Sequence, residues 1–412
     1  MSKEIPQILK GFRDYLPQEQ IARRKIIAKI SEVFERFGFV PLDTPSLESY
    51  ELFKDKLGED EKLMYKFVDL GGRLVALRYD LTVPLARVIA ENKNLPKPFK
   101  RYQIGNVWRA DKPQKGRYRE FMQCDIDIVG TDSILADAEV IAAMYAAYKA
   151  LEIGNFVLKF NDRKLVDQVL TKLNVAKENI VRFMRTLDKM DKLGEDNIKQ
   201  SLMEQGFDNN LLAQYAEEMD NLGKNYLVEM ENLLTGLGVE KMKFDKYLMR
   251  GLDYYTGIVF EFVLTEKPEF GSVGGGGRYD NLIEKTTGMK TPAVGGSIGL
   301  DRLFMALEDM GEITPRTAAE VIVFNLDKNF TADYLNMVTN LRAADIDTEI
   351  YYETAKLDKQ FKYAEAKNIQ VAVIYGSEEA KQRKVNLKNL KEKEQVTVDL
   401  DDLITQVKSM LW

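Results

Sequence analysis

The chain has 412 residues, of which 45% are hydrophobic and 30% charged, and its formal net charge at pH 7 is −6. This length allows two or three domains, each with its own hydrophobic core. No run approaches the roughly 20 apolar residues of a membrane span. The start, MSKEIPQILKGFRD, lacks the apolar core of a signal peptide and carries acids too early for a transit peptide. We therefore expect a cytoplasmic protein with no membrane association.

The sequence contains no histidine and a single cysteine, Cys124. This composition excludes histidine general bases, Ser-His-Asp triads and Cys-His pairs, and zinc sites built from histidine or several cysteines. One cysteine cannot form an intrachain disulfide, which suits a reducing cytosol. Any catalysis must rely on carboxylates, arginines, backbone dipoles or groups that the substrate supplies.

The first predicted element is a helix between residues 18 and 37, because apolar residues repeat there at helical spacing and Gly38 follows as a C-cap. These apolar residues are Ile26, Ile30, Val33, Phe34 and Phe37. Short strand-like segments punctuated by glycine and proline recur from 39 to 130. Among them, Arg73–Asp80 precedes a helix opened by LTVPLARVIA. This pattern predicts a mixed, mostly antiparallel sheet flanked by helices.

The segment 99–130 predicts a buried β-hairpin with a basic loop. Apolar and β-branched residues alternate or cluster on both sides of the loop, and Pro113 and Gly116 supply turn residues. One acid, Asp111, faces five basic residues. The basic residues are Arg109, Lys112, Lys115, Arg117 and Arg119. Cations fixed between two strands suit a triphosphate or a nucleic-acid end, although a solvated turn would have the same composition.

A region with few strand signals extends from about residue 163 to 240. Its apolar residues fit two helical faces. One face holds Leu165, Val169, Leu170 and Leu173, and the other Ile180, Met184 and Leu187. We expect a helical insertion within the sheet domain.

After about Pro315, strands and helices alternate. The segments 321–326, 348–353 and 370–376 are apolar at successive positions, as parallel strands buried on both faces are. KVNLKNL and QVTVDL are expected as edge strands, followed by a helix to Trp412. The lysine-rich stretch Lys381–Glu394 suits either contact with phosphates or a solvated face. This region predicts a C-terminal α/β domain.

Four spaced motifs resemble those of the class II histidyl-tRNA synthetases. The basic hairpin is similar to the second motif of that class, and GLDRLF, which contains Arg302, to its third. The segment RGLDYYTG (250–257) resembles the signature that separates the histidine enzymes from other class II enzymes. GFRDYLP (11–17) and FGFVPLDTPSLES (37–49) are similar to the family's opening and first motif. The resemblance covers nearly the whole chain.

The resemblance implies a class II catalytic domain at 1–318, of the α+β class, with the helical insertion at about 163–240. It implies a C-terminal α/β anticodon-binding domain at 319–412. The expected substrates are L-histidine, ATP with Mg²⁺, and tRNA(His), and a homodimer is expected. The metal ligands are not identified, because Mg²⁺ is expected to be bound to ATP.

The resemblance assigns catalysis to Arg109 and Arg250, which would hold the α-phosphate from two sides through their planar guanidinium groups. Arg117 and Arg302 would hold the β- and γ-phosphates. Phe121 would stack on adenine, although a buried aromatic strand residue is often only part of a core. The further ATP-binding candidate is Glu120, at the adenine edge or on Mg²⁺.

The same resemblance places a set of residues around the amino acid. These are Asp80, Leu81, Thr82, Arg109, Gln123, Asp127, Arg250, Tyr254, Tyr255 and Tyr279. Asp80 and Thr82, helped by Gln123, would bind the α-amine, and Asp127 and Tyr255 would bracket the imidazole, which has one donor and one acceptor when neutral. The glycine run 274–277 would let backbone approach the substrate; a flexible linker is the alternative.

An adenylate-forming reaction is compatible with the absence of histidine, because the substrate carboxylate is already a nucleophile at neutral pH. For the transfer to tRNA, a phosphate oxygen of the adenylate is the expected proton acceptor. Two alternatives remain open: a synthetase-like regulatory subunit of histidine biosynthesis, and a class II synthetase for proline, threonine or glycine. The presence of RGLDYYTG and of the C-terminal domain argues against the first, and RGLDYYTG with the pocket residues against the second.

Overall fold

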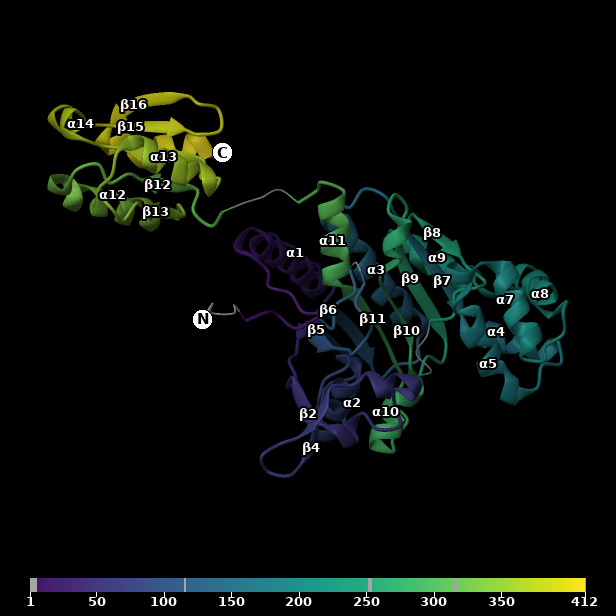
Figure 1. Cartoon of the computed structure of the whole chain (residues 1–412). Coiled ribbons are helices and arrows are strands. Elements are labelled where there is room, and N and C mark those ends of the chain that lie inside the picture. Colours follow the sequence, from purple (N-terminus) through teal and green to yellow (C-terminus); the bar gives the residue numbers. More distant parts are fainter. Residues whose placement is uncertain (1–5, 115, 251–253, 314–316, 412) are drawn as a thin grey trace. The chain divides into compact units, whose positions relative to one another are not determined.

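The computed structural model describes residues 6–114, 116–250, 254–313 and 317–411. Lys115 of the basic loop, residues 251–253 of the RGLDYYTG segment, Pro315 and Trp412 lie outside the described residues. The chain divides into two compact units (Figure 1), one formed by residues 1–13 and 26–312 and the other by 14–25 and 313–412. No helix in the described part of the chain is long and apolar enough to cross a membrane.

An eight-stranded sheet forms the centre of the first unit, with the strand order β1-β5-β6-β11-β10-β9-β7-β8. The strands are β1 (Val40–Pro41), β5 (Phe99–Trp108), β6 (Glu120–Val129), β7 (Phe156–Asp162), β8 (Met242–Phe244), β9 (Ile258–Leu264), β10 (Ser272–Arg278) and β11 (Ala293–Gly299). The pairs β1–β5 and β7–β8 are parallel and the other neighbours antiparallel. The expected mixed, mostly antiparallel sheet is confirmed.

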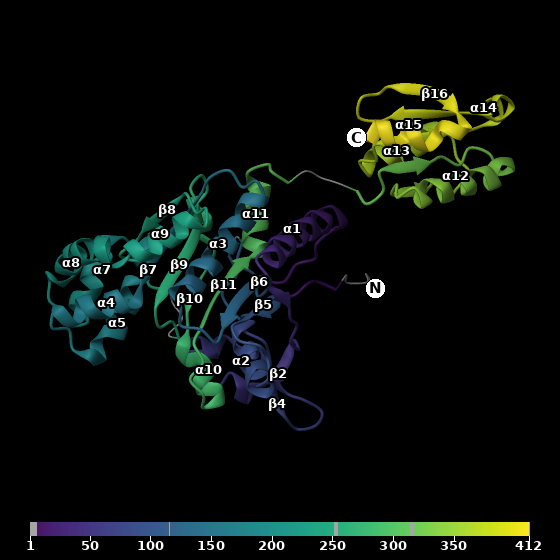
Figure 2. The same ribbon diagram turned by 180° about the vertical axis from the view of Figure 1, so that it is seen from behind.

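The two faces of this sheet have different neighbours. Successive residues of a strand point to opposite faces. A Cβ atom at Gly296 of β11 would overlap Met144 of helix α3 (Ile134–Ala150), whereas one at Gly295 would overlap the carboxylate of Asp127. Helix α3 therefore covers one face, and Figures 1 and 2 show it alongside the central strands. The opposite face carries the polar residues of the candidate site.

The remaining elements of the first unit surround this sheet. They are the part of α1 (Pro17–Arg36) from Ile26 onwards, α2 (Thr82–Glu91), α10 (Asp280–Thr287), α11 (Leu300–Asp309) and a small sheet of β2 (Leu47–Ser49), β3 (Lys66–Val68) and β4 (Leu74–Leu77). Helix α1 ends before Gly38, which has the expected positive φ of 78°. Its predicted apolar residues are buried except Phe37, which is only half-buried.

The predicted helical insertion is confirmed as a run of helices. These are α4 (Arg163–Lys172), α5 (Lys177–Leu187), α6 (Met190–Leu193), α7 (Glu195–Glu204), α8 (Leu211–Tyr226) and α9 (Val228–Gly236). The two predicted helical faces meet in one core, to which Phe183 and Tyr215 also contribute. Helix α9 differs, because it packs against α3 rather than in this core. Figures 1 and 2 show α4, α5, α7 and α8 together beyond β7.

The second unit contains a five-stranded sheet with the order β13-β12-β14-β15-β16. Its elements are β12 (Val321–Val323), α12 (Thr331–Ala343), β13 (Thr348–Ile350), α13 (Leu357–Ala366), β14 (Val371–Ile374), α14 (Ser377–Gln382), β15 (Lys384–Asn389), β16 (Gln395–Asp399) and α15 (Leu403–Leu411). The three predicted parallel strands are parallel. Two expectations are wrong: β13 is an edge strand and is not buried on both faces, and β15 lies inside the sheet. The next residues, up to Tyr352, leave the sheet, and Tyr352 is 88% exposed.

Candidate active site

The basic hairpin consists of β5 and β6 paired antiparallel, with Arg101 opposite Asp127 and Trp108 opposite Glu120. Since side chains alternate along β6, one face presents every second residue from the loop towards the far end of the strand. These residues are Phe121, Gln123, Asp125 and Asp127. The sequence of the strand therefore sets an aromatic ring, an amide and two carboxylates in a row.

The loop arginines are held by the protein itself. Arg117 donates from Nε and Nη2 to Asp111 Oδ2, at 3.0 and 2.6 Å. Arg109 donates from Nε to the carbonyl oxygen of Tyr79 at 3.1 Å. Its guanidinium carbon lies 4.3 Å from the centroid of the Tyr79 ring and 5.1 Å from that of Phe121. Both arginines are thus positioned before any ligand binds.

A cavity of about 250 Å³ lies beside this loop. Its lining includes four arginines from distant parts of the chain, namely Arg109, Arg117, Arg250 and Arg302. Burial lowers the pKa of Arg302, and the positive charges of the other three lower it further, against the opposing charge of Glu261. Mutually repelling cations around one cavity suit a multiply charged anion such as a triphosphate.

Arg250 reaches this cavity from the beginning of the RGLDYYTG segment. Its φ of 57° is unusual for a residue with a side chain, and such backbone conformations concentrate at functional sites. Nη1 donates to Glu261 Oε1 of β9 at 2.8 Å. A Cβ at Gly275 would lie 2.6 Å from the same nitrogen. The glycine run is therefore a packed strand, β10, in which Gly275 leaves room for Arg250, and it is not a linker.

A second, buried group of polar residues adjoins the cavity. Arg101 Nη2 lies 2.7 Å from Asp127 Oδ2, with both side chains at most 3% exposed. The Tyr279 hydroxyl donates to Asp127 Oδ1. Arg101 also donates to the carbonyl oxygen of Leu81 at 3.1 Å, and Asp80 Oδ1 accepts from the backbone nitrogens of Thr82 and Val83 at 3.2 and 2.9 Å.

Burial dominates the electrostatics of this group. It raises the pKa of Asp80 and of Asp127, and the charge of Arg101 only partly opposes the shift. The rings of Tyr254 and Tyr255 lie 4.9 Å apart by their centroids, and those of Tyr254 and Tyr279 6.0 Å. Aromatic rings and polar groups thus lie next to one another in this buried group, and a small polar molecule with a flat ring needs both kinds of contact.

The structure thus gathers the predicted site residues in two adjoining groups. Those that line the cavity are Arg109, Arg117, Phe121, Gln123, Arg250 and Arg302. Those in the buried group are Asp80, Leu81, Thr82, Asp127, Tyr254, Tyr255 and Tyr279. Electrostatic interactions join the groups, because Asp80 interacts with Arg109 and Tyr255 with Arg250.

Glu120 is not part of either group. Strand alternation puts it on the opposite face of β6 from Phe121, where it accepts a hydrogen bond from Asn106 Nδ2 at 2.8 Å. It is absent from the described lining of the cavity. The structure thus places Glu120 apart from the other ATP-binding candidates, and its role at the adenine edge or on a metal ion stays a prediction.

Sequence reasoning also missed residues that the structure places at the site. They are Arg101, Asp111, Asp125, Glu261, Ser297 and Asp301. Alternation along β6 could have identified Asp125, which is two residues from Asp127. Arg101, Glu261, Ser297 and Asp301 reach the site through pairing between distant strands and through helix α11, for which the local sequence gives no signal.

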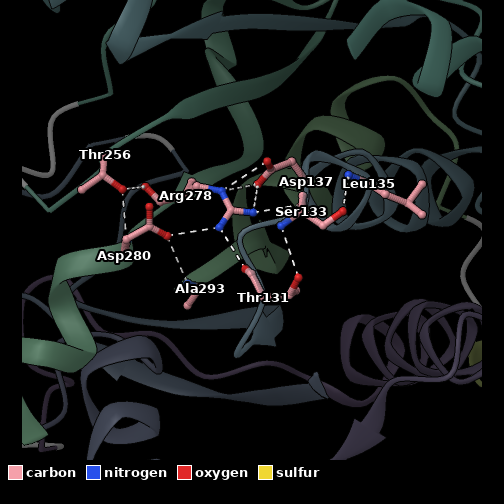
Figure 3. A network of polar contacts seen from close by, with 8 residues as sticks. All are labelled: Thr131, Ser133, Leu135, Asp137, Thr256, Arg278, Asp280 and Ala293. Carbon is pink, nitrogen blue, oxygen red and sulfur yellow. Dashed lines mark hydrogen bonds and ion pairs between the residues drawn. The ribbon is translucent and has the colours of Figure 1, made fainter. Parts of the chain in front are cut away.

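A network around Arg278 fixes the end of the RGLDYYTG segment (Figure 3). Arg278 Nε donates to Asp137 Oδ1 at 2.9 Å, and Nη1 donates to Asp280 Oδ1 and to the carbonyl oxygen of Thr131, both at 3.1 Å. The backbone nitrogen of Thr256 donates to the carbonyl oxygen of Arg278 at 2.7 Å. This network connects Thr256, the residue after the two tyrosines, to β10 and to the start of α3.

Changing Arg278 to lysine is expected to lower the free energy of unfolding by about 1–3 kcal/mol, because an ammonium cannot make the bonds of the planar fork. Burial raises the pKa of Asp137 to about 6 although Arg278 opposes the rise, so this carboxylate depends on its partner. Urea unfolding measures the effect. The matched control is Arg36→Lys in an exposed pair with Glu32, for which about 0.5 kcal/mol or less is expected; equal losses in the two variants would contradict the prediction.

A mixed antiparallel sheet with a basic hairpin, arginines around an anion-sized cavity and a separate α/β unit define a class II aminoacyl-tRNA synthetase. The family model of histidyl-tRNA synthetase matches residues 11–303, and that of an anticodon binding domain matches 320–410. The chain belongs to the histidyl-tRNA synthetase family.

Individual relatives agree with this assignment. Histidine--tRNA ligases from Rhodopirellula baltica and Wolinella succinogenes are each 40% identical, over 94% and 93% of this chain and 94% of each relative. The crystal structure of histidyl-tRNA synthetase from Nostoc has a TM-score of 0.87 at 32% identity and covers 98% of this chain and 99% of that one. A structure from Bacillus halodurans, described as an ATP phosphoribosyltransferase regulatory subunit/histidyl-tRNA synthetase, has a TM-score of 0.75 at 25% identity, with 91% and 99% coverage.

Proposed function

We propose that the chain is a histidine–tRNA ligase. It activates L-histidine with ATP to histidyl-adenylate and pyrophosphate, and then transfers histidine to the 3′ end of tRNA(His). The observation that carries this proposal is the convergence of Arg109 and Arg250 on one cavity that adjoins the buried Asp127–Tyr279 pair. The family supplies the name of the reaction. These residues supply binding places for the two substrates of its first step, ATP and histidine.

In the first step, the histidine carboxylate attacks the α-phosphorus of ATP in line. Arg109 and Arg250 stabilise the charge that grows on the α-phosphate oxygens, and because they are already held in place, little reorganisation is needed. Arg117 and Arg302 hold the β- and γ-phosphates. The ring of Phe121, which lines the cavity, stacks on adenine.

Magnesium would enter this site bound to ATP. The described residues contain no group of three or more carboxylates or cysteines suited to a metal ion. Glu261 and Asp301 line the cavity and supply the oxygen donors that a phosphate-bound Mg²⁺ prefers. The ion would neutralise the charge of the pyrophosphate leaving group.

The buried group would hold histidine. Asp127 and Tyr255 bracket the imidazole, and Tyr279 orients Asp127 through its hydroxyl. The α-amine is bound by Asp80, Thr82 and Gln123. A neutral imidazole satisfies one acceptor and one donor, and an amino acid that lacks them would leave buried polar groups unpaired. This explains selection against other amino acids.

In the second step, the terminal adenosine hydroxyl of the tRNA attacks the activated carbonyl, the bond between the carbonyl carbon and the phosphate oxygen breaks to release AMP, and another phosphate oxygen of the adenylate accepts the proton. The catalytic domain comprises residues 1–318, and the anticodon-binding domain 319–412. The family model of an anticodon binding domain, which matches 320–410, supports anticodon binding by the second of these domains. The reaction takes place in the cytoplasm.

The enzyme would act as a homodimer. Apolar side chains between 40 and 74 remain exposed around the small sheet and β1. They are Val40, Leu47, Phe67, Val68, Leu70 and Leu74, with exposed fractions from 41% to 110%. Exposed apolar residues grouped in this way are typical of a surface that another protein covers. Light scattering after size-exclusion chromatography should give a mass near twice the 47.2 kDa of the chain.

The test of the function is which amino acid drives isotope exchange between pyrophosphate and ATP. L-Histidine alone is expected to do so, with rates for proline, threonine and glycine at background. Exchange with one of those three would favour another class II enzyme. No exchange with any amino acid would favour a regulatory protein.

A further inference from the structure

Asp125 belongs to the buried polar group beside the cavity and has no role in the function proposed above. It lies on β6 between Gln123 and Asp127 on the same face, opposite Gln103 of β5 and Ser297 of β11. Its side chain is buried, with 3% exposed. One carboxylate oxygen, Oδ1, has no hydrogen-bond partner. A buried carboxylate oxygen without a donor is costly, so a ligand group is its natural partner.

Two other buried acceptor atoms near Asp125 also lack a hydrogen-bond donor. They are Asp80 Oδ2 and Gln123 Oε1. Asp80 lies close enough to raise the pKa of Asp125 by its charge. Gln123 Nε2 donates to Ser297 Oγ at 3.0 Å, and Ser297 also hydrogen-bonds to Asp125. Within the described part of the chain, three acceptors without donors therefore belong to linked residues, of which Gln123 lines the cavity.

A purely structural role as the partner of Arg101 does not account for Asp125. Arg101 forms its ion pair with Asp127 and donates to the carbonyl oxygen of Leu81. Its charge reaches Asp125 and lowers the pKa of that carboxyl, but burial outweighs it. Among the residues that the structure describes, Asp125 thus has no arginine or lysine in direct ion-pair contact.

We infer that Asp125 is a specificity-determining residue that binds the α-ammonium group of the amino-acid substrate. An ammonium has three N–H donors and no acceptor, and Asp80 Oδ2, Gln123 Oε1 and Asp125 Oδ1 offer one acceptor to each. The inference rests on the proposed function and adds a residue to it. It requires a substrate with a positively charged α-amine and disfavours an α-hydroxy analogue.

The test uses two competitive inhibitors that share the imidazole. L-Histidinol keeps the α-amine, whereas imidazole-4-lactate has a hydroxyl in its place. Asp125→Asn in the full chain should raise the Ki of histidinol about 10- to 100-fold and leave that of imidazole-4-lactate within about twofold. The matched control, Asp127→Asn, should weaken both, because Asp127 faces the shared imidazole. The unchanged binding of imidazole-4-lactate also shows that the Asp125→Asn pocket is folded; if that variant does not fold, Asp125→Ser takes its place.

A pH series provides a second readout. Burial raises the pKa of Asp125 to about 7, so the carboxylate is ionised above that pH and must lose a proton on binding below it. The charged or titratable groups that interact with it are Arg101 of β5, Asp127 of β6, Arg78 and Asp80 between β4 and α2, and Tyr255 before β9. The ratio of the histidinol Ki of Asp125→Asn to that of the unchanged protein should fall towards 1 below pH 7. The ratio cancels the titration of the inhibitor's own imidazole.

The outcomes separate the inference from the function on which it rests. Equal weakening of both inhibitors, or no weakening of histidinol, would overturn the role of Asp125. Absence of histidine-dependent exchange in the unchanged protein would instead overturn the proposed function.

Discussion

Replacing Arg250 with alanine is expected to slow histidine-dependent ATP–pyrophosphate exchange by about 100- to 1,000-fold, the usual cost of removing one preorganised donor to transition-state charge. Arg250 lines the cavity together with Arg109, and the room for its guanidinium comes from Gly275. No histidine in the chain could take over its function. Initial rates at saturating histidine and ATP measure the change in kcat.

Two control variants separate catalysis from folding. Arg250→Ala leaves Glu261 without its partner at 2.8 Å, so some loss of stability is expected from the unpaired carboxylate. The double variant Arg250→Ala/Glu261→Ala should recover the melting temperature and be at least as slow as the single variant. Arg250→Lys keeps the charge without the planar fork and should be intermediate. Exchange near the original rate in a folded Arg250→Ala protein would remove Arg250 from the catalytic step.

Local sequence patterns predicted those parts of the site that lie within one element. The alternation of β6 and the turn residues of its loop predicted the hairpin, and Arg109, Arg117 and Phe121 line the cavity as a result. The same alternation separates Glu120 from this set, and its role stays a prediction. Glu120 is adjacent to Phe121 in the sequence but points to the other face.

Contacts between distant segments could not be predicted in this way. Arg101 is the third residue of β5, a strand whose own pattern gives no reason for a buried charge; the reason is Asp127 on the paired strand. Glu261 similarly belongs to the site because it pairs with Arg250, which lies in a different segment of the chain. In the second unit, the burial of β15 depends on β16 pairing along its outer side, a long-range contact that its own sequence does not encode.

The second large effect is expected from Arg101→Met, which should lower the free energy of unfolding at pH 8 by about 3–5 kcal/mol, the cost of removing one partner of a buried ion pair. Arg101 is fully buried, and its charge acts on Asp127, Asp125 and Asp80 together. Methionine fills a similar volume without the charge, so the loss reports electrostatics more than packing. Urea unfolding, monitored by a signal from the catalytic unit, measures this change in the free energy of unfolding.

The pH dependence of this loss distinguishes a charge effect from a packing effect. Burial raises the folded-state pKa of Asp125 to about 7 and that of Asp127 above its usual value, while Arg101 opposes both shifts. A carboxyl with a raised folded pKa stabilises the protein below its unfolded pKa, and this contribution is lost as the pH rises through the folded pKa. Without Arg101 the folded pKa values rise further, so the loss in Arg101→Met should be largest near pH 8 and smaller near pH 5.

Two controls complete the argument. In Arg101→Met/Asp127→Asn the unpaired carboxylate is also removed, so much of the stability at pH 8 should return even though two polar partners are gone. Arg36→Met, in an exposed pair with Glu32, should change stability by about 0.5 kcal/mol or less at either pH. A loss in Arg101→Met that is the same at pH 5 and pH 8, and that the second substitution does not relieve, would mean that Arg101 contributes packing and hydrogen bonds rather than the charge that keeps three buried carboxylates in the pocket.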